Sequence, residues 1–143
     1  MDIQQRQQQI IDEFSAMPDW EERYKRIIEY GRELGPMDEQ HKTDKNKVKG
    51  CQSTVWLHAG LKDGAVHFQG DSDAMIVRGL IALLLKVYSG ATPEEIVKTP
   101  PDFVVATGLA GHLSQTRANG LAAMVKQIKM YAAVFQAVQK QGR

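Results

Sequence analysis

The chain has little cysteine, little excess charge and no long apolar run. One cysteine in 143 residues rules out an internal disulfide. Structural zinc sites commonly need four close ligands, and this cysteine with four scattered histidines does not supply them. The formal net charge of +1 gives no overall attraction to nucleic acid or to anionic membranes. The longest apolar run, Gly79 to Leu85, is too short to cross a bilayer.

Chain length, the N-terminal sequence and the lone cysteine indicate how many domains to expect and in which compartment. A chain of 143 residues has the usual length of one domain, so we expect a single domain over residues 1–143. No basic segment followed by an apolar stretch opens the sequence, as it would in a signal peptide. A lone cysteine also suits a reducing compartment. We therefore expect a cytoplasmic protein that binds neither membrane nor nucleic acid.

Apolar periodicity predicts two helices in the first quarter of the chain. Residues 3–14 carry apolar side chains at helical spacing, and residues 20–34 do the same after a break at Pro18. Gly35-Pro36 is a stop signal for the second helix. Residues 37–50 contain four lysines and few apolar side chains, which indicates an exposed basic loop.

The middle of the chain predicts a hairpin followed by a buried helix. A β-rich run at residues 54–59 and an alternating run at 66–68 are separated by Lys62-Asp63-Gly64, a strong hairpin signal. Residues 76–88 form the most apolar stretch, typical of a helix buried on more than one face. In the preceding Gly70-Asp71-Ser72-Asp73, one side chain is expected to cap that helix.

The C-terminal part predicts a short helix, a broken segment and a long helix. Thr92-Pro93-Glu94-Glu95 is a helix start with a capping box, and Pro100-Pro101 ends that helix. A broken segment at 102–112 precedes a last helix that begins near residues 114–116. The order of helices, hairpin and helices favours an α+β domain. We expect a small antiparallel sheet, a hairpin to which a third strand could add, packed against several helices.

Cys51 is the main candidate for chemistry. It follows Gly50, whose backbone freedom can display a neighbouring side chain at a loop tip. Nearby lysines such as Lys49 would stabilise its thiolate, the reactive form. The alternative is a small buried apolar side chain, as most lone cysteines are. Trp56 is expected to pack beneath this cysteine loop.

Other polar residues allow two interpretations each. Asp71 and Asp73 could form a paired-carboxylate site or contact a partner, or could simply cap the next helix. The positive charge of Arg117 is unfavourable near the start of the last helix, because a helix N-terminus is itself partly positive. Arg117 therefore either serves another purpose or is merely solvated. His58 and His67 could meet across the hairpin, but two separate, partly exposed strand histidines are the simpler interpretation.

Three stretches together resemble one known family. They are Gly50-Cys51-Gln52-Ser53-Thr54-Val55-Trp56, Gly70-Asp71-Ser72-Asp73-Ala74-Met75-Ile76-Val77-Arg78-Gly79-Leu80, and His112-Leu113-Ser114-Gln115-Thr116-Arg117-Ala118-Asn119-Gly120-Leu121. In this order and at these separations they look like the SufE family of sulfur acceptors in iron–sulfur cluster assembly. The similarity runs from the N-terminal helices to about Tyr131. It implies an α+β fold shared with scaffold proteins of the IscU type.

The resemblance also implies roles for particular residues. Cys51 would attack a persulfide on a SufS-like cysteine desulfurase, stimulate that enzyme, and pass the sulfur to an iron–sulfur scaffold complex. Gln52 belongs to the reactive loop, and Asp73 and Arg117 match residues of the surface that faces the desulfurase. The chain would need no cofactor of its own, since pyridoxal phosphate belongs to the desulfurase. It would be an accessory protein with a transient persulfide rather than a free-standing enzyme.

Departures and alternatives accompany the resemblance. Relatives often carry Thr-Pro-Ser-Arg where this chain has Ser114-Gln115-Thr116-Arg117, and the missing proline could loosen that helix start. The polar tail after Tyr131 lies outside the match. A regulatory partner that stimulates a desulfurase without carrying sulfur is one alternative, and a hydrolase pairing Cys51 with His112 or His58 is another. The sequence leaves a homodimer open.

Overall fold

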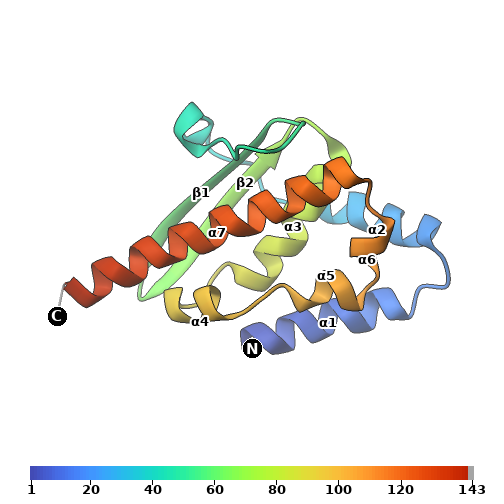
Figure 1. Ribbon diagram of the computed structural model, residues 1–143, viewed down its shortest axis with the longest axis horizontal. Coiled ribbons are helices and arrows are strands. Elements are labelled where there is room, and N and C mark those ends of the chain that lie inside the picture. Colours follow the sequence, from blue (N-terminus) through green and yellow to red (C-terminus); the bar gives the residue numbers. More distant parts are fainter. Residues whose placement is uncertain (142–143) are drawn as a thin grey trace.

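Helices pack against a two-stranded antiparallel sheet in the computed structural model, which describes residues 1–141 (Figure 1). The predicted α+β class is therefore confirmed. In chain order the elements are α1 (Ile3–Ser15), α2 (Trp20–Glu33), β1 (Val55–Lys62), β2 (Ala65–Ser72), α3 (Met75–Tyr88), α4 (Pro93–Lys98), α5 (Asp102–Ala106), α6 (Leu109–His112) and α7 (Gln115–Gln141). None of the helices in these residues is long and apolar enough to cross a membrane.

The hairpin forms where its turn residues predict it. Asp63 and Gly64 have φ of 53° and 79°, the left-handed pair that a two-residue turn of a right-twisted hairpin requires. The register runs from Lys62 opposite Ala65 to Val55 opposite Ser72. Isolated bridges flank the hairpin, but no third strand forms within residues 1–141. The third strand that we left open is thus absent from the described part of the chain.

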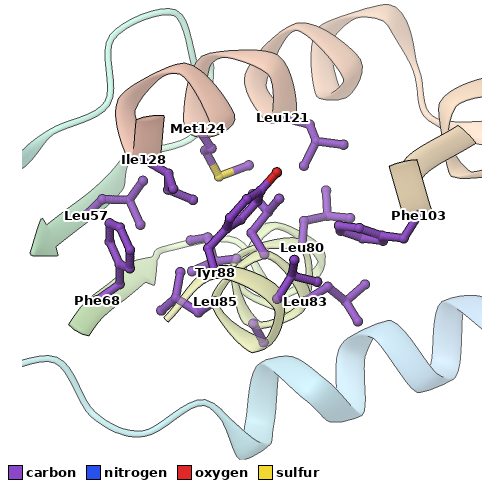
Figure 2. Packing of buried hydrophobic residues seen from close by; sticks show 14 of the residues in the cluster. Leu57, Phe68, Leu80, Leu83, Leu85, Tyr88, Phe103, Leu121, Met124 and Ile128 are labelled. Carbon is purple, nitrogen blue, oxygen red and sulfur yellow. The ribbon is translucent and has the colours of Figure 1, made fainter. Parts of the chain in front are cut away.

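The core lies between the hairpin, α3 and α7. Helix α3 is buried on several faces, because ten of its residues are shielded from solvent. Figure 2 shows Tyr88 of α3 reaching between Ile128 and Met124 of α7 and the labelled leucines of α3. Its hydroxyl donates a 2.8 Å hydrogen bond to the carbonyl of Thr99, so this buried polar atom is satisfied. Phe68 and Leu57 cover the core from the sheet (Figure 2).

Helices α2 and α3 cross with their backbones in close contact. A Cβ atom on Gly79 would lie 2.1 Å from the carbonyl oxygen of Ile27, and one on Gly31 would lie 2.8 Å from the amide nitrogen of Gly79. Both distances are shorter than van der Waals contact. The two glycines are therefore required by the approach of the helices.

Helix α4 begins as the sequence predicts and ends on a lysine of α7. Thr92 and Glu95 form the expected capping box, with Pro93 at the first helical position. At the other end, Lys129 Nζ donates hydrogen bonds to the carbonyls of Ile96, Val97 and Thr99 at 3.1, 3.0 and 2.9 Å. This ammonium satisfies carbonyls that a helix end leaves free and ties α4 to α7.

Lys129→Met should therefore destabilise the protein. Loss of the ammonium leaves partly buried carbonyls without a donor, at a cost of about 1–3 kcal/mol in unfolding free energy. Lys126→Met, which changes an exposed lysine one turn earlier, should cost far less. Thermal unfolding of both variants tests this, and equal losses would contradict the role given to Lys129.

Residues 37–50 are more ordered than the exposed loop we expected. Two short 3-10 turns, Glu39–His41 and Asp44–Asn46, occupy this segment. Asn46 and Val48 are buried between exposed lysines, and Val48 donates a 2.9 Å hydrogen bond to the carbonyl of Val55. The prediction of exposure holds for Lys45, Lys47 and Lys49, while Lys42 is half-buried and the apolar and amide side chains anchor the segment to the fold. The polar tail after Tyr131 continues α7 as far as Gln141, and its last two residues lie outside the described part.

Candidate functional site

Cys51 lies in the loop before β1 with its side chain against α7. Its thiol donates to the carbonyl oxygen of Gly120, with Sγ 3.6 Å away. A Cβ atom on Gly120 would lie 3.5 Å from that sulfur, which is an ordinary van der Waals contact, so Cys51 packs directly against the backbone of α7 at this position. Gly50 has φ of 94°, a left-handed conformation that favours glycine. The backbone that presents Cys51 thus depends on Gly50, and the carbonyl of Gly120 receives the thiol.

The electrostatic environment of Cys51 differs from our expectation. Its side chain is half-buried, and burial raises the pKa of the Cys51 thiol. We had expected lysines to lower this pKa, and that prediction is wrong. Lys49 and Lys47 line a separate depression on the other side of Gly50, while Cys51 lines its own pocket. Cys51 therefore rests as the protonated thiol.

The raised pKa predicts slow alkylation of Cys51. At neutral pH, iodoacetamide should modify the folded chain more slowly than a Gly-Cys-Gln peptide, because a smaller fraction of the folded thiol is ionised. The alkylation rate should rise with pH, and the pH at which it reaches half its maximum should be higher for the folded chain than for the peptide. Measuring both rates across the alkaline range tests this. A folded chain that reacts faster than the peptide at neutral pH would contradict it.

A pocket of about 350 Å³ opens beside the Cys51 sulfur. It combines a polar rim with an apolar floor. Its lining residues are Cys51, Gln52, Ser53, Val77, Leu80, Ser114, Thr116, Arg117, Gly120 and Met124. The structure thus brings three of the predicted site residues, Cys51, Gln52 and Arg117, to one pocket, while Asp73 is not among its lining residues.

The pocket lacks the histidine that a Cys–His hydrolase needs. His112 stacks on Trp20 with the ring centroids 3.8 Å apart, and His58 stacks on His41 at 3.6 Å. Neither imidazole lines the pocket, so the hydrolase alternative loses its general base. His58 lies opposite Gln69 in the hairpin, so the cross-strand meeting with His67 is replaced by the stack on His41. Among residues 1–141, no three His, Cys, Asp or Glu side chains gather in a group that could hold a metal ion.

Arg117 is exposed in the first turn of α7. The backbone N–H of Arg117 donates a 3.2 Å hydrogen bond to Ser114 Oγ. Ser114 therefore caps the helix, so this helix start is satisfied without a proline. The guanidinium makes no ion pair within the described residues. Within residues 1–141, Arg117 is thus a cation without an ion-pair partner, and it lines the Cys51 pocket.

Ser72 and Asp73 hold the end of the cysteine loop instead of capping α3. Asp73 Oδ1 accepts a 3.2 Å hydrogen bond from the N–H of Thr54, and Ser72 Oγ donates a 2.7 Å hydrogen bond to the carbonyl of Thr54. The residue at the start of α3 is Ala74, and no side chain caps it. Ser72 Oγ also accepts a 3.2 Å hydrogen bond from the N–H of Ala74, but neither Ser72 nor Asp73 bonds an N–H inside the first turn of α3, so the capping prediction is wrong.

Asp71 is part of an ion-pair cluster. It lies 3.0 Å from Lys42 Nζ and 3.4 Å from Arg78 Nε. Burial raises the pKa of Asp71, but Lys42, the Ser72 N–H and Arg78 outweigh burial and lower it overall. Asp71 and Asp73 thus bind different partners and do not form a paired-carboxylate site. Lys42 also lies 5.5 Å above the ring of Trp56, so Trp56 packs beneath the basic segment that leads to Cys51.

Two residues have roles in the site that the sequence interpretation did not give them. Gly120 accepts the hydrogen bond from Cys51, and Ser72 anchors Thr54. A glycine inside an apolar helix is the signal that would have indicated close approach at Gly120. Ser72 offered no separate signal, because a serine beside aspartates before a helix is typical of a cap.

Comparisons with known proteins agree with the fold and the motifs. The sequence model of the SufE family, described as an Fe-S metabolism associated domain, matches residues 8–132. An uncharacterized SufE-like protein of Synechocystis is 45% identical over 133 residues, which cover 93% of this chain and 84% of the relative. A similar protein of Rhizobium meliloti is 46% identical over 129 residues, which cover 87% and 92% of the two chains.

A solved structure supports the fold independently. The solution structure of a hypothetical protein from Thermus thermophilus matches with a TM-score of 0.76, over 90% of this chain and 93% of that one. Its sequence identity is 24%, so it carries an argument for the fold alone. The family match spans nearly the whole chain and the relatives align over most of their length. The chain therefore belongs to the SufE family, and its general role lies in iron–sulfur metabolism.

Proposed function

We propose that the chain is a sulfur carrier that receives sulfur on Cys51 from a cysteine desulfurase and delivers it to an iron–sulfur scaffold complex. The observation that carries the proposal is the position of Cys51, the one thiol of the chain, in a pocket of about 350 Å³ with Gln52 and Arg117. This pocket has room for an added sulfur atom. The family's association with iron–sulfur metabolism supports sulfur as the cargo.

The transfer is a thiol exchange without net oxidation. Cys51 attacks the terminal sulfur of the desulfurase persulfide, the S–S bond of that persulfide breaks, and a new S–S bond forms on Cys51. The proton of the Cys51 thiol ends on the cysteine thiolate that the desulfurase releases. Delivery repeats the exchange, with Cys51 as the leaving thiolate. A chain with one cysteine cannot lose the sulfur by forming its own disulfide.

The resting state of Cys51 suits a protected carrier. The half-buried thiol, its bond to the Gly120 carbonyl and its raised pKa all keep it unreactive in the free chain. A docked desulfurase must displace that bond and favour the thiolate. Sulfur would then move only when the correct partner is bound.

Transfer of labelled sulfur tests the proposal. A desulfurase is loaded with ³⁵S from cysteine, freed of substrate and mixed with the chain. On a non-reducing gel the label should move to the 16.0 kDa band and be released by a thiol reductant. Label that stays on the desulfurase would count against the carrier.

Arg117→Ala should weaken stimulation of the desulfurase without unfolding the chain. The side chain is exposed and unfavourable at a helix N-terminus, so its loss should change the unfolding free energy by less than about 1 kcal/mol. Desulfurase turnover at limiting concentrations of the chain is the measurement. Arg32→Ala, on an exposed arginine of α2 outside the Cys51 pocket, is the matched control. Equal stimulation by both variants would remove Arg117 from the docking surface.

One observation favours a second candidate, a partner that stimulates the desulfurase without carrying sulfur. The pKa of Cys51 is raised, so its thiol is a poor nucleophile in the free chain. Exposed Gln52, Asp73 and Arg117 could serve docking alone. The Cys51→Ser variant separates the two candidates, as argued in the Discussion.

A further inference from the structure

We propose that a basic groove beside Cys51 binds an acidic segment of the cysteine desulfurase, a docking contact separate from the Cys51 pocket; this inference rests on the proposed function. The basic groove has a volume of about 430 Å³ and lies between the segment before Cys51 and helix α7. Its lining residues are Asp44, Lys45, Lys47, Lys49, Ala123, Lys126, Gln127 and Met130. The Cys51 pocket shares none of them.

The basic groove carries positive charge that the fold does not neutralise. Asp44 pairs with Lys47 at 3.2 Å, and within residues 1–141 no ion pair includes Lys45, Lys49 or Lys126. Helix α7, one wall of the groove, has no Asp or Glu in its 27 residues. By contrast, Arg26 of α2 lies within ion-pair distance of three glutamates. The net charge of +1 for the whole chain hides this local excess.

The lysines of the basic groove are fixed by the residues between them. Asn46 and Val48 alternate with Lys45, Lys47 and Lys49 and point into the protein. Asn46 donates a 2.8 Å hydrogen bond to the carbonyl of His41 and accepts one of 2.9 Å from the Tyr131 hydroxyl. The backbone that carries the lysines is therefore anchored before a partner arrives. An anchored surface loses less conformational entropy on binding than a mobile loop does.

The position of the basic groove suits docking for sulfur transfer. Successive turns of α7 face first Cys51 and then the groove. The Cys51 sulfur lies against Gly120, and Gly50 lies against Ala123, to which a Cβ on Gly50 would approach within 3.5 Å. A partner seated in the groove therefore contacts Lys49, two residues before Cys51, and Ala123, less than one helical turn after Gly120. Figure 1 shows the segment before β1 passing above the N-terminal half of α7.

The lining favours an acidic protein segment over a nucleic acid. Among the described residues no aromatic side chain lines the basic groove, whereas proteins that bind single strands commonly stack bases on aromatic rings. Its wall includes Ala123 and the half-exposed Met130, and exposed Val134 and Val138 follow along α7 at intervals of four residues. Lysines beside such an apolar stripe complement an amphipathic segment with carboxylates on one side.

Charge reversal tests the proposal. We expect the triple variant Lys45→Glu, Lys49→Glu, Lys126→Glu to raise the Kd for the desulfurase by at least about 10-fold at low salt. Wild-type affinity should fall as salt increases, and the variant should lose most of that dependence. The control triple Lys62→Glu, Lys98→Glu, Lys140→Glu makes the same charge change at exposed lysines outside the groove and should bind within about twofold of wild type. Thermal unfolding confirms that each variant is folded.

Three outcomes would overturn the basic groove as a docking site. The groove triple could bind the desulfurase as tightly as wild type, or the control triple could lose as much affinity for the desulfurase as the groove triple. The third outcome is that the groove triple loses binding of a labelled oligonucleotide but keeps its affinity for the desulfurase. Sulfur loading at saturating desulfurase separates this inference from the proposed function. Weak binding of the groove triple with full loading at saturation supports the groove and the carrier together. A wild-type chain that binds through the groove but gains no sulfur supports the docking site and overturns the carrier.

Discussion

Cys51→Ser should abolish sulfur loading and leave the fold intact. A serine hydroxyl is close in size to a thiol and can still donate to the Gly120 carbonyl, so the side chain should keep its position against α7. The unfolding free energy should change by less than about 1 kcal/mol. A serine oxygen cannot hold a persulfide, so delivery of sulfur to a scaffold should fall to the level without the chain. Cluster formation on the scaffold, followed by absorbance, is the measurement.

The same variant decides between carrier and activator. A pure activator with Cys51→Ser would keep its stimulation of the desulfurase, because docking does not need the thiol. Ser53→Ala, a change in the same pocket, is the control and should retain both loading and delivery. Full delivery by Cys51→Ser would contradict the proposed function outright.

Gly79→Ala should be the most damaging small substitution in the fold. The added Cβ would lie 2.1 Å from the carbonyl oxygen of Ile27 and 2.5 Å from a methyl carbon of that side chain. Because backbone cannot move aside as a side chain can, α2 and α3 must separate. We expect a loss of about 1–3 kcal/mol or more, although alanine favours helix by about 1 kcal/mol. A loss of this size should lower Tm by several degrees and is measured by thermal unfolding.

Gly111→Ala is the matched control for that change. Gly111 is also helical, and nothing lies within 4 Å of the Cβ that would be added there. Its substitution should be neutral or stabilising, since only the helix propensity changes. If Gly79→Ala were as stable as Gly111→Ala, the close crossing of α2 and α3 would be wrong.

Local signals predicted much of the fold. Asp63-Gly64 favours a left-handed turn, and the hairpin forms there. Thr92-Pro93 and Glu95 start α4 as their capping chemistry requires. These features depend on residues at most three positions apart, so the sequence contains the information directly.

Contacts between distant segments were beyond sequence reasoning. Lysines near Cys51 in the chain predicted a lowered pKa, but the side chain turns toward α7, where burial raises it. Ser72 and Asp73 could have capped α3, yet the backbone of Thr54, 18 residues earlier than Ser72, binds both. In each case local preference competed with a partner brought close only by the fold.

Intact-protein mass spectrometry tests the central claim most directly. The chain is incubated with a cysteine desulfurase and cysteine, separated and weighed under non-reducing conditions. We predict a species heavier by one sulfur atom that a thiol reductant removes, with the added sulfur mapped to Cys51 and no such species in Cys51→Ser. A chain that accelerates the desulfurase but never gains sulfur would contradict the carrier and leave the activator in its place.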